Sequence, residues 1–447
     1  MIYVCDAIMG AGKSTAAINH MNAHPHKKFI YVTPYVDETK RVKAACPALR
    51  FALPSSAKEE FDHQKRQHFK HLLTCGMNIA TTHVLFSLCD AEMIQFIEEQ
   101  DYTIIIDEAI GVLDKIPAKS DDVQMAMSSP WFQCVDCDDG QVHEIVVTDK
   151  EYNGVWMKDL KMYASSHQLV ALKDDDGEDK LYCWMFNAKL LQAANEIFIL
   201  TYIFESSPMC YLLQMEQLEY RHTYVVKAAD GSLRFSTVER YTPEYTRTLR
   251  DKIHIVQSAR MNRIGDRDNA LSINWLKNAV KTKKDGRIDD LQRNLSNYFN
   301  NIHRGTDPEQ KLWSTHSVAQ YALKGKGYTN RFLAFNARAT NDYRSATVLA
   351  YCANVYMPLW EKRYYEKQGV TVDENAYALS TLIQWIWRSA IRDGEEIWIY
   401  IPSKRMRTLL ENWLDEVSST GLEGGDDVAT VSPYPNPAED AGEKNIA

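Results

Sequence analysis

A short glycine-rich segment near the start of the chain contains the residue types that bind phosphate groups. Residues 7–15 read Ala-Ile-Met-Gly-Ala-Gly-Lys-Ser-Thr, between an apolar run at 2–5 that favours a strand and a run at 13–22 that is compatible with a helix. Glycines let the backbone approach phosphate oxygens, and the free N–H groups at the start of a helix attract anions. We therefore predict a nucleotide-phosphate loop here.

The side chains of this loop have distinct expected roles. Lys13 would reach the β- and γ-phosphates of a nucleotide, Ser14 would give its hydroxyl oxygen to Mg²⁺, and Thr15 would contact the α-phosphate. The predicted phosphate-binding residues are Ala7, Gly10, Ala11, Gly12, Lys13, Ser14 and Thr15.

Two adjacent acids follow a second apolar run. Residues 103–106 read Thr-Ile-Ile-Ile and lead into Asp107 and Glu108. Because ligands bind at the carboxyl ends of strands in open parallel sheets, acids in this place can serve a nucleotide. We expect Asp107 to hold Mg²⁺ through water and Glu108 to act as the general base for the attacking water. An acidic strand end alone is usually only solvated, and the phosphate loop upstream favours the catalytic interpretation.

Polar residues that could face a nucleotide recur near the other end of the chain. Gln384, Arg388 and Arg392 lie in an aromatic and aliphatic run that contains Trp385 and Ile391. The two arginines have a spacing that places both on one face of a helix. A buried guanidinium needs an anionic partner, and a phosphate across a cleft would be one. The alternative is a solvated basic helix face.

The segments that must position these residues alternate between strand-like and helix-like patterns. This alternation is typical of parallel sheets that are covered by helices on both faces, so the expected fold class is α/β. Strands are expected at 2–5, 29–32, 78–81, 102–106, 197–202, 224–226, 254–256, 332–335 and 397–401, and helices at 37–45, 57–73, 91–99, 289–301 and 379–391.

The alternation is interrupted at 114–186, which we expect to be an insertion. It is rich in Asp and contains a hairpin candidate, with strands at 169–172 and 181–186 around an acidic turn at 174–177. The expected domains are a first lobe at 1–215 that includes the insertion, a second lobe at 216–416, and a tail at 417–447 whose Gly, Pro and acidic residues predict disorder.

The composition is that of an ordinary globular protein. The chain has 447 residues, of which 45% are hydrophobic and 25% charged, and a net charge of −9. The negative charge argues against coating nucleic acid through the overall field, although a local basic groove is compatible with it. Nine scattered cysteines, the lack of a signal-peptide pattern and the lack of a long apolar run favour a cytoplasmic protein without a membrane segment.

Taken together, the segments resemble the motifs of superfamily 2 helicases. Residues 7–15 resemble motif I, and 107–110, Asp-Glu-Ala-Ile, resemble the DEAD/DEAH-type motif II. Residues 384–392 resemble motif VI, with Trp387 in place of the usual glycine and Arg392 one residue later than the pattern.

Shorter segments match further motifs of this family in the right order. Residues 32–34 resemble motif Ia, 80–83 resemble a later strand-contacting motif, and 336–343 resemble motif V. Residues 200–203 lie where motif III belongs and keep Thr201 but not its small residues. The resemblance covers roughly residues 1–415 and is nearest to helicase-like proteins of bacteriophages.

The resemblance implies two RecA-like lobes with ATP and Mg²⁺ between them. It implies an ATP-dependent helicase or translocase that acts on single-stranded or forked DNA in phage replication or recombination. The protein would be a monomer or weak oligomer in the host cytoplasm, and the acidic insertion at 114–186 favours a protein partner. The implied catalytic residues are Lys13, Asp107, Glu108, Gln384, Arg388 and Arg392, the metal ligands Ser14 and Asp107, and the nucleic-acid contacts Thr33, Pro34, Thr81, Thr82, His83, Thr340 and Asn341.

Other functions remain open at this point. One is a DNA-binding or origin-loading protein that uses ATP as a switch without unwinding. Another is a DNA-packaging ATPase, which should carry a nuclease domain where the motif VI match lies. Cys134 and Cys137 near His143 could suggest zinc, but no second pair exists and plain thiols are preferred. The basic runs at 277–287 and 324–328 could be solvated faces, or could line a nucleic-acid path with Trp313 and Tyr328 stacked on bases.

Overall fold

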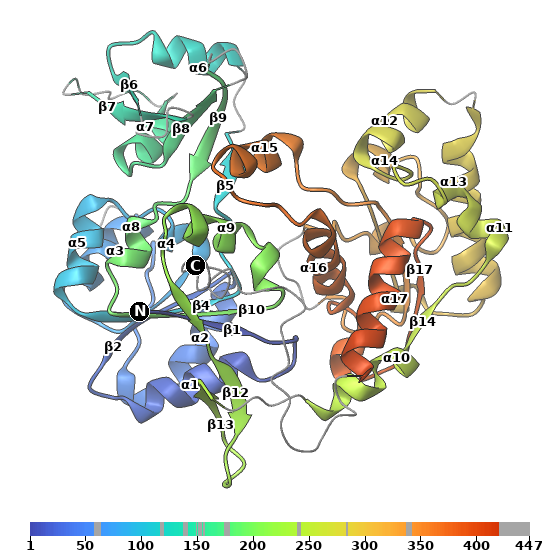
Figure 1. The fold of residues 1–447 in the computed structure, drawn as a ribbon, viewed down its shortest axis with the longest axis horizontal. Helices are drawn as coiled ribbons and strands as arrows, with labels where there is room; N and C mark the ends of the chain where they lie inside the picture. Colours follow the sequence, from blue (N-terminus) through green and yellow to red (C-terminus); the bar gives the residue numbers. More distant parts are fainter. Residues whose placement is uncertain are drawn as a thin grey trace, which may run out of the picture.

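Short apolar runs form the strands of two separate parallel sheets, one in each half of the chain (Figure 1). Helices flank both sheets, so the predicted fold class of two α/β lobes is confirmed. None of the helices in the described part of the chain has the length and apolar character that a membrane crossing requires. The computed structural model describes residues 1–57, 64–116, 120–136, 142–148, 150, 154, 157–173, 179–238, 243–282, 285–336 and 342–419.

The first sheet has six parallel strands in the order β11-β1-β10-β4-β2-β3. Its inner strands are buried on both faces and therefore consist of nearly continuous apolar residues, as in the Tyr-Thr-Ile-Ile-Ile run of β4. The strands are β1 (Ile2–Asp6), β2 (Lys28–Thr33), β3 (Ile79–Thr82), β4 (Tyr102–Asp107), β10 (Glu196–Thr201) and β11 (Tyr220–His222).

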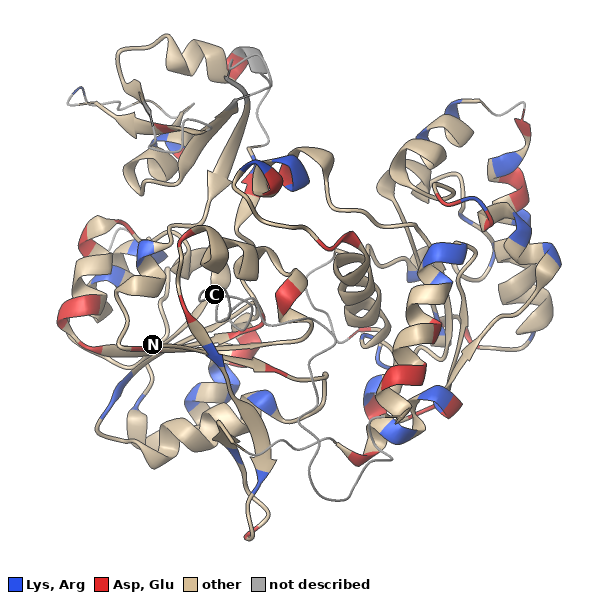
Figure 2. Ribbon diagram, in the orientation of Figure 1, with Lys and Arg blue, Asp and Glu red and all other residues tan. Residues whose placement is uncertain are grey.

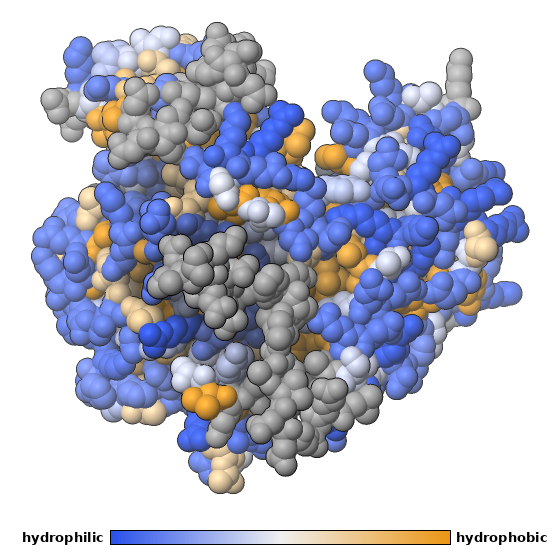
Figure 3. Space-filling view, in the orientation of Figure 1, coloured by the Kyte–Doolittle hydropathy of each residue, from blue (hydrophilic) through white to orange (hydrophobic). Residues whose placement is uncertain are grey.

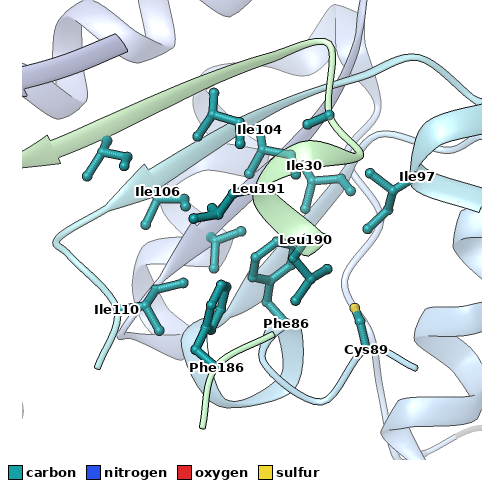
Figure 4. Close-up of a cluster of buried hydrophobic side chains, with 14 of the residues drawn as sticks. Ile30, Phe86, Cys89, Ile97, Ile104, Ile106, Ile110, Phe186, Leu190 and Leu191 are labelled. Atoms are coloured by element: carbon teal, nitrogen blue, oxygen red, sulfur yellow. The ribbon is translucent and has the colours of Figure 1, made fainter. Parts of the chain in front are cut away.

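Helices cover both faces of the first sheet. On one face lie α1 (Lys13–Ala23) and α2 (Val36–Ala45), together with a hairpin of β12 (Tyr224–Lys227) and β13 (Leu233–Ser236). The apolar side chains of the other face are drawn in Figure 4, where Phe86 and Phe186 pack near Leu190 beneath Ile104 and Ile106. The helices of that face are α3 (Lys65–Thr74), α4 (His83–Phe86), α5 (Ala91–Glu99), α8 (Lys189–Gln192) and α9 (Pro208–Met215).

The second sheet has four parallel strands in the order β14-β17-β16-β15. Two long helices cover the face toward the first lobe: α16 (Glu374–Ile386), which begins at the capping side chain of Asp373, and α17 (Lys404–Ser419). The strands are β14 (Ile253–Ile255), β15 (Lys311–Thr315), β16 (Val348–Cys352) and β17 (Ile397–Tyr400). The remaining helices are α10 (Leu249–Lys252), α11 (Ala259–Asn262), α12 (Ile273–Lys281), α13 (Arg287–Asn297), α14 (Ser317–Gln320) and α15 (Leu359–Lys367).

Two expectations for this lobe were wrong. The run at 332–335 is no strand, since Phe332 makes only an isolated bridge to Trp313. Trp313 belongs to β15, a strand that was not predicted. The helix predicted to reach residue 391 ends at Ile386. The reason is local: the Ser389 hydroxyl donates to the Ile386 carbonyl, and the Ala390 N–H donates to Ala346, so the backbone leaves the helix there.

The insertion forms a separate five-stranded antiparallel sheet that stands above the first lobe (Figure 1). The expected hairpin strands pair as predicted, β8 with β9, and the predicted turn at 174–177 lies outside the described residues. The sheet has the order β5-β9-β8-β7-β6. Its elements are β5 (Leu113–Lys115), α6 (Ser120–Met127), β6 (Phe132–Asp136), β7 (Val142–Val147), α7 (Lys158–Ser165), β8 (Leu169–Lys173) and β9 (Asp179–Met185).

The base of the insertion contacts the second lobe through α15. Leu113 and Cys183 share an apolar cluster with Tyr365, and the Tyr364 hydroxyl donates to Met185 Sδ at 3.4 Å. Glu361 on the same helix is buried, and burial together with the charge of Asp114 raises the pKa of its carboxyl to about 7. The insertion therefore touches both lobes.

Strand pairing bears on the boundary between the lobes. Although 215/216 was the predicted boundary, β11 at Tyr220–His222 pairs with β1, and the hairpin β12–β13 packs on α1. We propose on this ground that the first lobe continues to Ser236 and that the second begins before Ile253. The proposed tail at 417–447 begins within α17, and residues 420–447 lie outside the described part.

Candidate functional site

The glycine loop joins β1 to α1 in the geometry that a phosphate site requires. Gly10 and Gly12 have φ angles of 85° and 86°, in the left-handed region that favours glycine. A side chain at position 12 would also collide with Leu233 of the hairpin, since its Cβ would lie 2.2 Å from Cδ1. Gly10, Gly12 and the first residues of α1 line the space between the lobes, so the N-terminus of that helix lies beside it.

Lys13 bridges back to the start of the loop. Its ammonium donates to the carbonyl of Ala7 and, at 3.3 Å, to that of Ile8. Burial lowers the pKa of Lys13, although nearby acids, among them Asp107 and Asp6, counteract this. An anion beside the ammonium would offset the cost of burying its charge, so Lys13 is ready to exchange loop carbonyls for phosphate oxygens.

Asp107 at the end of β4 is fixed from three sides. Ser14 Oγ lies 3.0 and 3.1 Å from its two carboxylate oxygens, and the Tyr31 hydroxyl donates to Oδ2 at 2.7 Å. His83 Nε2 lies 2.9 Å from its backbone carbonyl oxygen. Burial raises the pKa of Asp107, whereas the bonds from Tyr31 and Ser14 lower it. Ser14 at the start of α1 and Asp107 at the end of β4 are therefore in contact, and their role as metal ligands stays a prediction.

This pair fits Mg²⁺. A hydroxyl and a carboxylate that already meet are the oxygen ligands that this ion takes from proteins, together with water and substrate phosphates. A site of this kind does not need a cage of protein ligands. In the described residues, no group of three or more His, Cys, Asp or Glu is arranged to hold a metal ion. Of the possible zinc ligands, Cys134 is exposed and Cys137 lies outside the described residues.

Glu108 has an unusual backbone conformation at the floor of the site. Its φ is 65°, and its N–H donates to the carbonyl of Leu200 in the neighbouring strand at 2.9 Å. The side chain reaches solvent in the open cleft, but the surrounding protein raises the pKa of its carboxyl. The charge of Arg388 opposes this rise more strongly than that of Lys13 or Arg392 does. The acid and the arginine therefore interact across the space between the lobes.

That space is a cleft of about 1200 Å³. Figure 3 shows hydrophilic surface over most of this side of the molecule, with apolar atoms where the second lobe faces the first. Figure 2 shows that α16, which borders the cleft, carries a charge only at its start. The predicted catalytic residues all line the cleft: Lys13, Asp107, Glu108, Gln384, Arg388 and Arg392.

The arginines reach the cleft in a different way from that predicted. They do not share a helix face: Arg388 follows the end of α16, and Arg392 lies in a 3₁₀ turn (Ala390–Asp393). Arg388 donates to the hydroxyl of Tyr35, at the start of α2, at 3.3 Å. Gln384 lies exposed on α16 and donates to Ser380 at 3.2 Å. The turn still delivers both guanidinium groups to the cleft.

The expected nucleic-acid residues are only in part accessible. Thr33 and Thr81 are buried near the ends of β2 and β3, His83 is buried at the start of α4, and Pro34 and Thr82 are half-buried. Thr340 and Asn341 lie outside the described residues. The nucleic-acid role of this set stays a prediction.

The aromatic residues considered for base stacking are buried in the second lobe. Trp313 and Tyr328 are at most 1% exposed and pack edge-to-face at 5.7 Å, so neither can stack on a base. Tyr321, by contrast, is 83% exposed, with Lys324 Nζ 4.9 Å from its ring centre. Sequence spacing gave no reason to prefer it.

Several residues that hold the site were not predicted. Tyr31 fixes Asp107, and Asp6 accepts hydrogen bonds at 2.8 Å from the N–H groups of Ile203 and Phe204. Trp413 donates to the Tyr202 hydroxyl at 2.7 Å. Asp6 could have been predicted as a supporting residue because it directly precedes the phosphate loop. Trp413 lies in no motif, so the sequence offered no signal for it.

The comparisons with known proteins extend over nearly the whole chain. Among solved structures, S. tokodaii Xpd4 has a TM-score of 0.45 and 11% identity and covers 92% of this chain and 94% of that one. A structure described as an XPD helicase has a TM-score of 0.39 and 12% identity, over 94% and 95% of the two chains. TM-scores this low do not establish a shared fold.

The sequence comparisons are more specific. The family model of the YonV C-terminal Rossmann-like domain matches residues 247–414. The SPbeta prophage-derived uncharacterized protein YonV of Bacillus subtilis (strain 168) is 35% identical over 422 residues, which are 93% of this chain and 98% of that protein. Since this identity spans both chains almost completely, the protein belongs to the YonV family.

Proposed function

We propose that the protein is an ATP-hydrolysing motor, a helicase or translocase that acts on nucleic acid. The observation that carries this proposal is the composition of the cleft. One lobe contributes Lys13 and the acids Asp107 and Glu108, and the other contributes Arg388 and Arg392. A site divided in this way is complete only when the two lobes approach each other, which couples hydrolysis to their motion.

The residues of the chain divide the work of hydrolysis. The N–H groups after Gly12 and the ammonium of Lys13 would bind the phosphates. Ser14 and Asp107 would hold Mg²⁺, which neutralises phosphate charge when bound. Glu108 would take the proton of the attacking water, and its raised pKa brings its basicity closer to that task. Arg388 and Arg392 would stabilise the charge that develops on the γ-phosphoryl group.

DNA is the proposed substrate, and the host cytoplasm the proposed location. The relative that spans the chain is described as prophage-derived, and phage chromosomes are replicated and recombined as DNA in the host. The motif resemblance to phage helicase-like proteins supports the same substrate. The insertion, which contacts both lobes, would follow their movement and is the proposed site for a protein partner.

An ATPase assay with purified protein tests the proposal. Turnover would be measured alone and with single-stranded DNA, duplex DNA or RNA, together with displacement of a labelled strand from a forked duplex. We expect stimulation by single-stranded DNA of about tenfold or more, weakened by salt because the contacts are to phosphates. Unstimulated hydrolysis would favour an ATP-switched binding protein, and absence of ATP hydrolysis would contradict the proposal.

A further inference from the structure

A tryptophan outside every motif lies at the junction of the two lobes. Trp413 of α17 donates its indole N–H to the Tyr202 hydroxyl at 2.7 Å, and the two rings meet edge-to-face at 6.4 Å. Tyr202 belongs to the first lobe, in the loop after β10, and lines the cleft. This hydrogen bond therefore joins the lobes at the cleft itself.

The same indole also contacts the turn that carries the arginine. The rings of Trp413 and Trp387 meet edge-to-face, with centres 5.9 Å apart and an angle of 83°. Both tryptophans are buried, with 4% and 6% of their surface exposed. Trp387 directly precedes Arg388, so its ring fixes the backbone from which the guanidinium extends.

These contacts are made by two of the residues at which the chain departs from the superfamily 2 motifs. Tyr202 stands where motif III has a small residue, and Trp387 stands where motif VI has glycine. Neither a small side chain nor glycine could reach Trp413 in this way. The two departures are thus complementary, since both large side chains pack on one indole.

The first-lobe side of this contact is itself rigid. Asp6 at the end of β1 accepts hydrogen bonds from the N–H groups of Ile203 and Phe204, both at 2.8 Å. Ile203 and Ile8 of the phosphate loop share one apolar cluster with Trp387 and Trp413. The position of Trp413 is therefore tied to the strand that leads into the phosphate loop.

The side chain of Arg388 is itself only weakly fixed by hydrogen bonds. Its guanidinium donates to Tyr35 at 3.3 Å, which is long for an N–H···O bond. Its backbone N–H donates to Trp385 in the last turn of α16 at 3.1 Å. The direction of the side chain therefore depends mainly on the backbone turn, which Trp387 packs in place.

We propose that Trp413 is a positioning residue for hydrolysis. By holding Tyr202 of one lobe against Trp387 of the other, it sets the place of Arg388 relative to Glu108 and the γ-phosphate. The inference rests on the proposed ATP hydrolysis and adds to it a residue that acts through Arg388. Displacement of a transition-state group by about 1 Å can cost about 100-fold in rate, so the expected effect is large.

The test compares two tryptophan substitutions in the full-length protein. Trp413→Phe removes the bond to Tyr202 and shortens the ring that Trp387 contacts. Trp313→Phe is the matched control, because Trp313 is equally buried and donates to the carbonyl of Tyr328 at 2.9 Å within the second lobe. Both should lower the melting temperature. Trp413→Phe alone should lower kcat, by about tenfold to 100-fold, with KM for ATP changed by less than about threefold.

A double-mutant cycle separates positioning from packing. If Trp413 acts through Arg388, then Trp413→Phe should change kcat by less than about twofold in an Arg388→Ala background. Tyr202→Phe, which removes only the hydroxyl, should fold even if Trp413→Phe does not. It should lower kcat by about threefold to fivefold in the native background and not in Arg388→Ala.

The outcomes distinguish this inference from the proposed function. Suppose that DNA stimulates ATP hydrolysis by the wild type. If kcat is then equal in Trp413→Phe and Trp313→Phe, or if the loss of kcat in Trp413→Phe adds to that in Arg388→Ala, the positioning role alone is overturned. A wild type that hydrolyses no ATP overturns the proposed function and the positioning role with it.

Discussion

The two walls of the cleft are built in different ways. In the first lobe, Ser14 and Tyr31 each donate a hydrogen bond to the carboxylate of Asp107, at 2.7 to 3.1 Å. In the second lobe, Gln384 and Arg392 are exposed, and the guanidinium of Arg388 makes a long hydrogen bond to Tyr35. One wall is arranged before any ligand binds, whereas the other depends on contacts that cross between the lobes.

We infer from this difference that the two walls have different roles in hydrolysis. The residues of the first wall lie at the carboxyl ends of strands of one sheet, so their geometry does not change when the lobes move relative to each other. The arginine wall sits on a turn, and its distance to the phosphates changes with lobe position. We therefore expect substitutions in the first wall to affect chemistry and metal binding directly, and those in the second to affect kcat through closure.

The largest effect should come from the general base. Glu108→Gln preserves the size of the side chain but removes its basicity, so kcat should fall by about 10³-fold while ATP binding changes little. Steady-state ATPase rates and binding of a fluorescent ATP analogue measure the two quantities. Glu99→Gln, at an exposed position on α5, is the control with no expected effect. Hydrolysis at the native rate in Glu108→Gln would exclude this residue as the base.

The next largest effect should come from Arg388 in the second wall, and it should include a change in the pH dependence of kcat. Arg388→Ala should lower kcat by about 100-fold, because a donor to the developing phosphate charge is lost. It should also shift the pH profile. Glu108 must be deprotonated to act, so kcat falls as pH drops through its pKa, which lies above the ordinary 4.5. Arg388 holds that pKa down, so its removal should move this acid limb to higher pH.

The control variant for this experiment removes the same charge, one arginine, at another place. Arg250→Ala removes an arginine that pairs with Asp415 on the surface of α10, away from the cleft. Its pH profile should match that of the wild type. An acid limb that stays in place in Arg388→Ala would show that Arg388 and Glu108 do not interact across the cleft.

The smallest effect should come from the support of the metal ligand. Tyr31→Phe removes one hydrogen bond to Asp107, and a loss of about 1 kcal/mol corresponds to about a fivefold higher Mg²⁺ requirement. Titration of ATPase activity with Mg²⁺ measures it. Tyr102→Phe is the matched control in the same sheet, because its hydroxyl donates to the Met77 carbonyl instead. Equal Mg²⁺ curves for the two variants would assign Tyr31 to packing alone.

The sequence predicted the first wall better than the second, for a physical reason. A strand that is buried on both faces must be apolar along its whole length, so β4 is recognisable from its residues alone. The phosphate loop is short and local. β15 at Lys311–Thr315 has only two apolar residues, Leu312 and Trp313, and lies at the edge of its sheet, so its pattern is weak and 332–335 was predicted as a strand instead.

The supporting contacts could not be predicted because they join distant parts of the chain. Tyr31 and Asp107 are 76 positions apart, and Tyr202 and Trp413 are 211 apart. No periodicity or motif links such pairs; only the folded arrangement of strands does. The helix that was expected to present both arginines failed for a local reason, the side chain of Ser389, which competes for the backbone.

The contact between the insertion and α15 has a mechanical consequence. It joins the lobes at a place apart from the bond of Trp413 to Tyr202 and the bond of Arg388 to Tyr35. Attachments at separate points oppose direct separation of the lobes and favour rotation of one lobe against the other. The attachment at α15 contains Glu361, and burial together with the charge of Asp114 raises the pKa of its carboxyl to about 7, so acidification through that pH would protonate a carboxyl at this attachment.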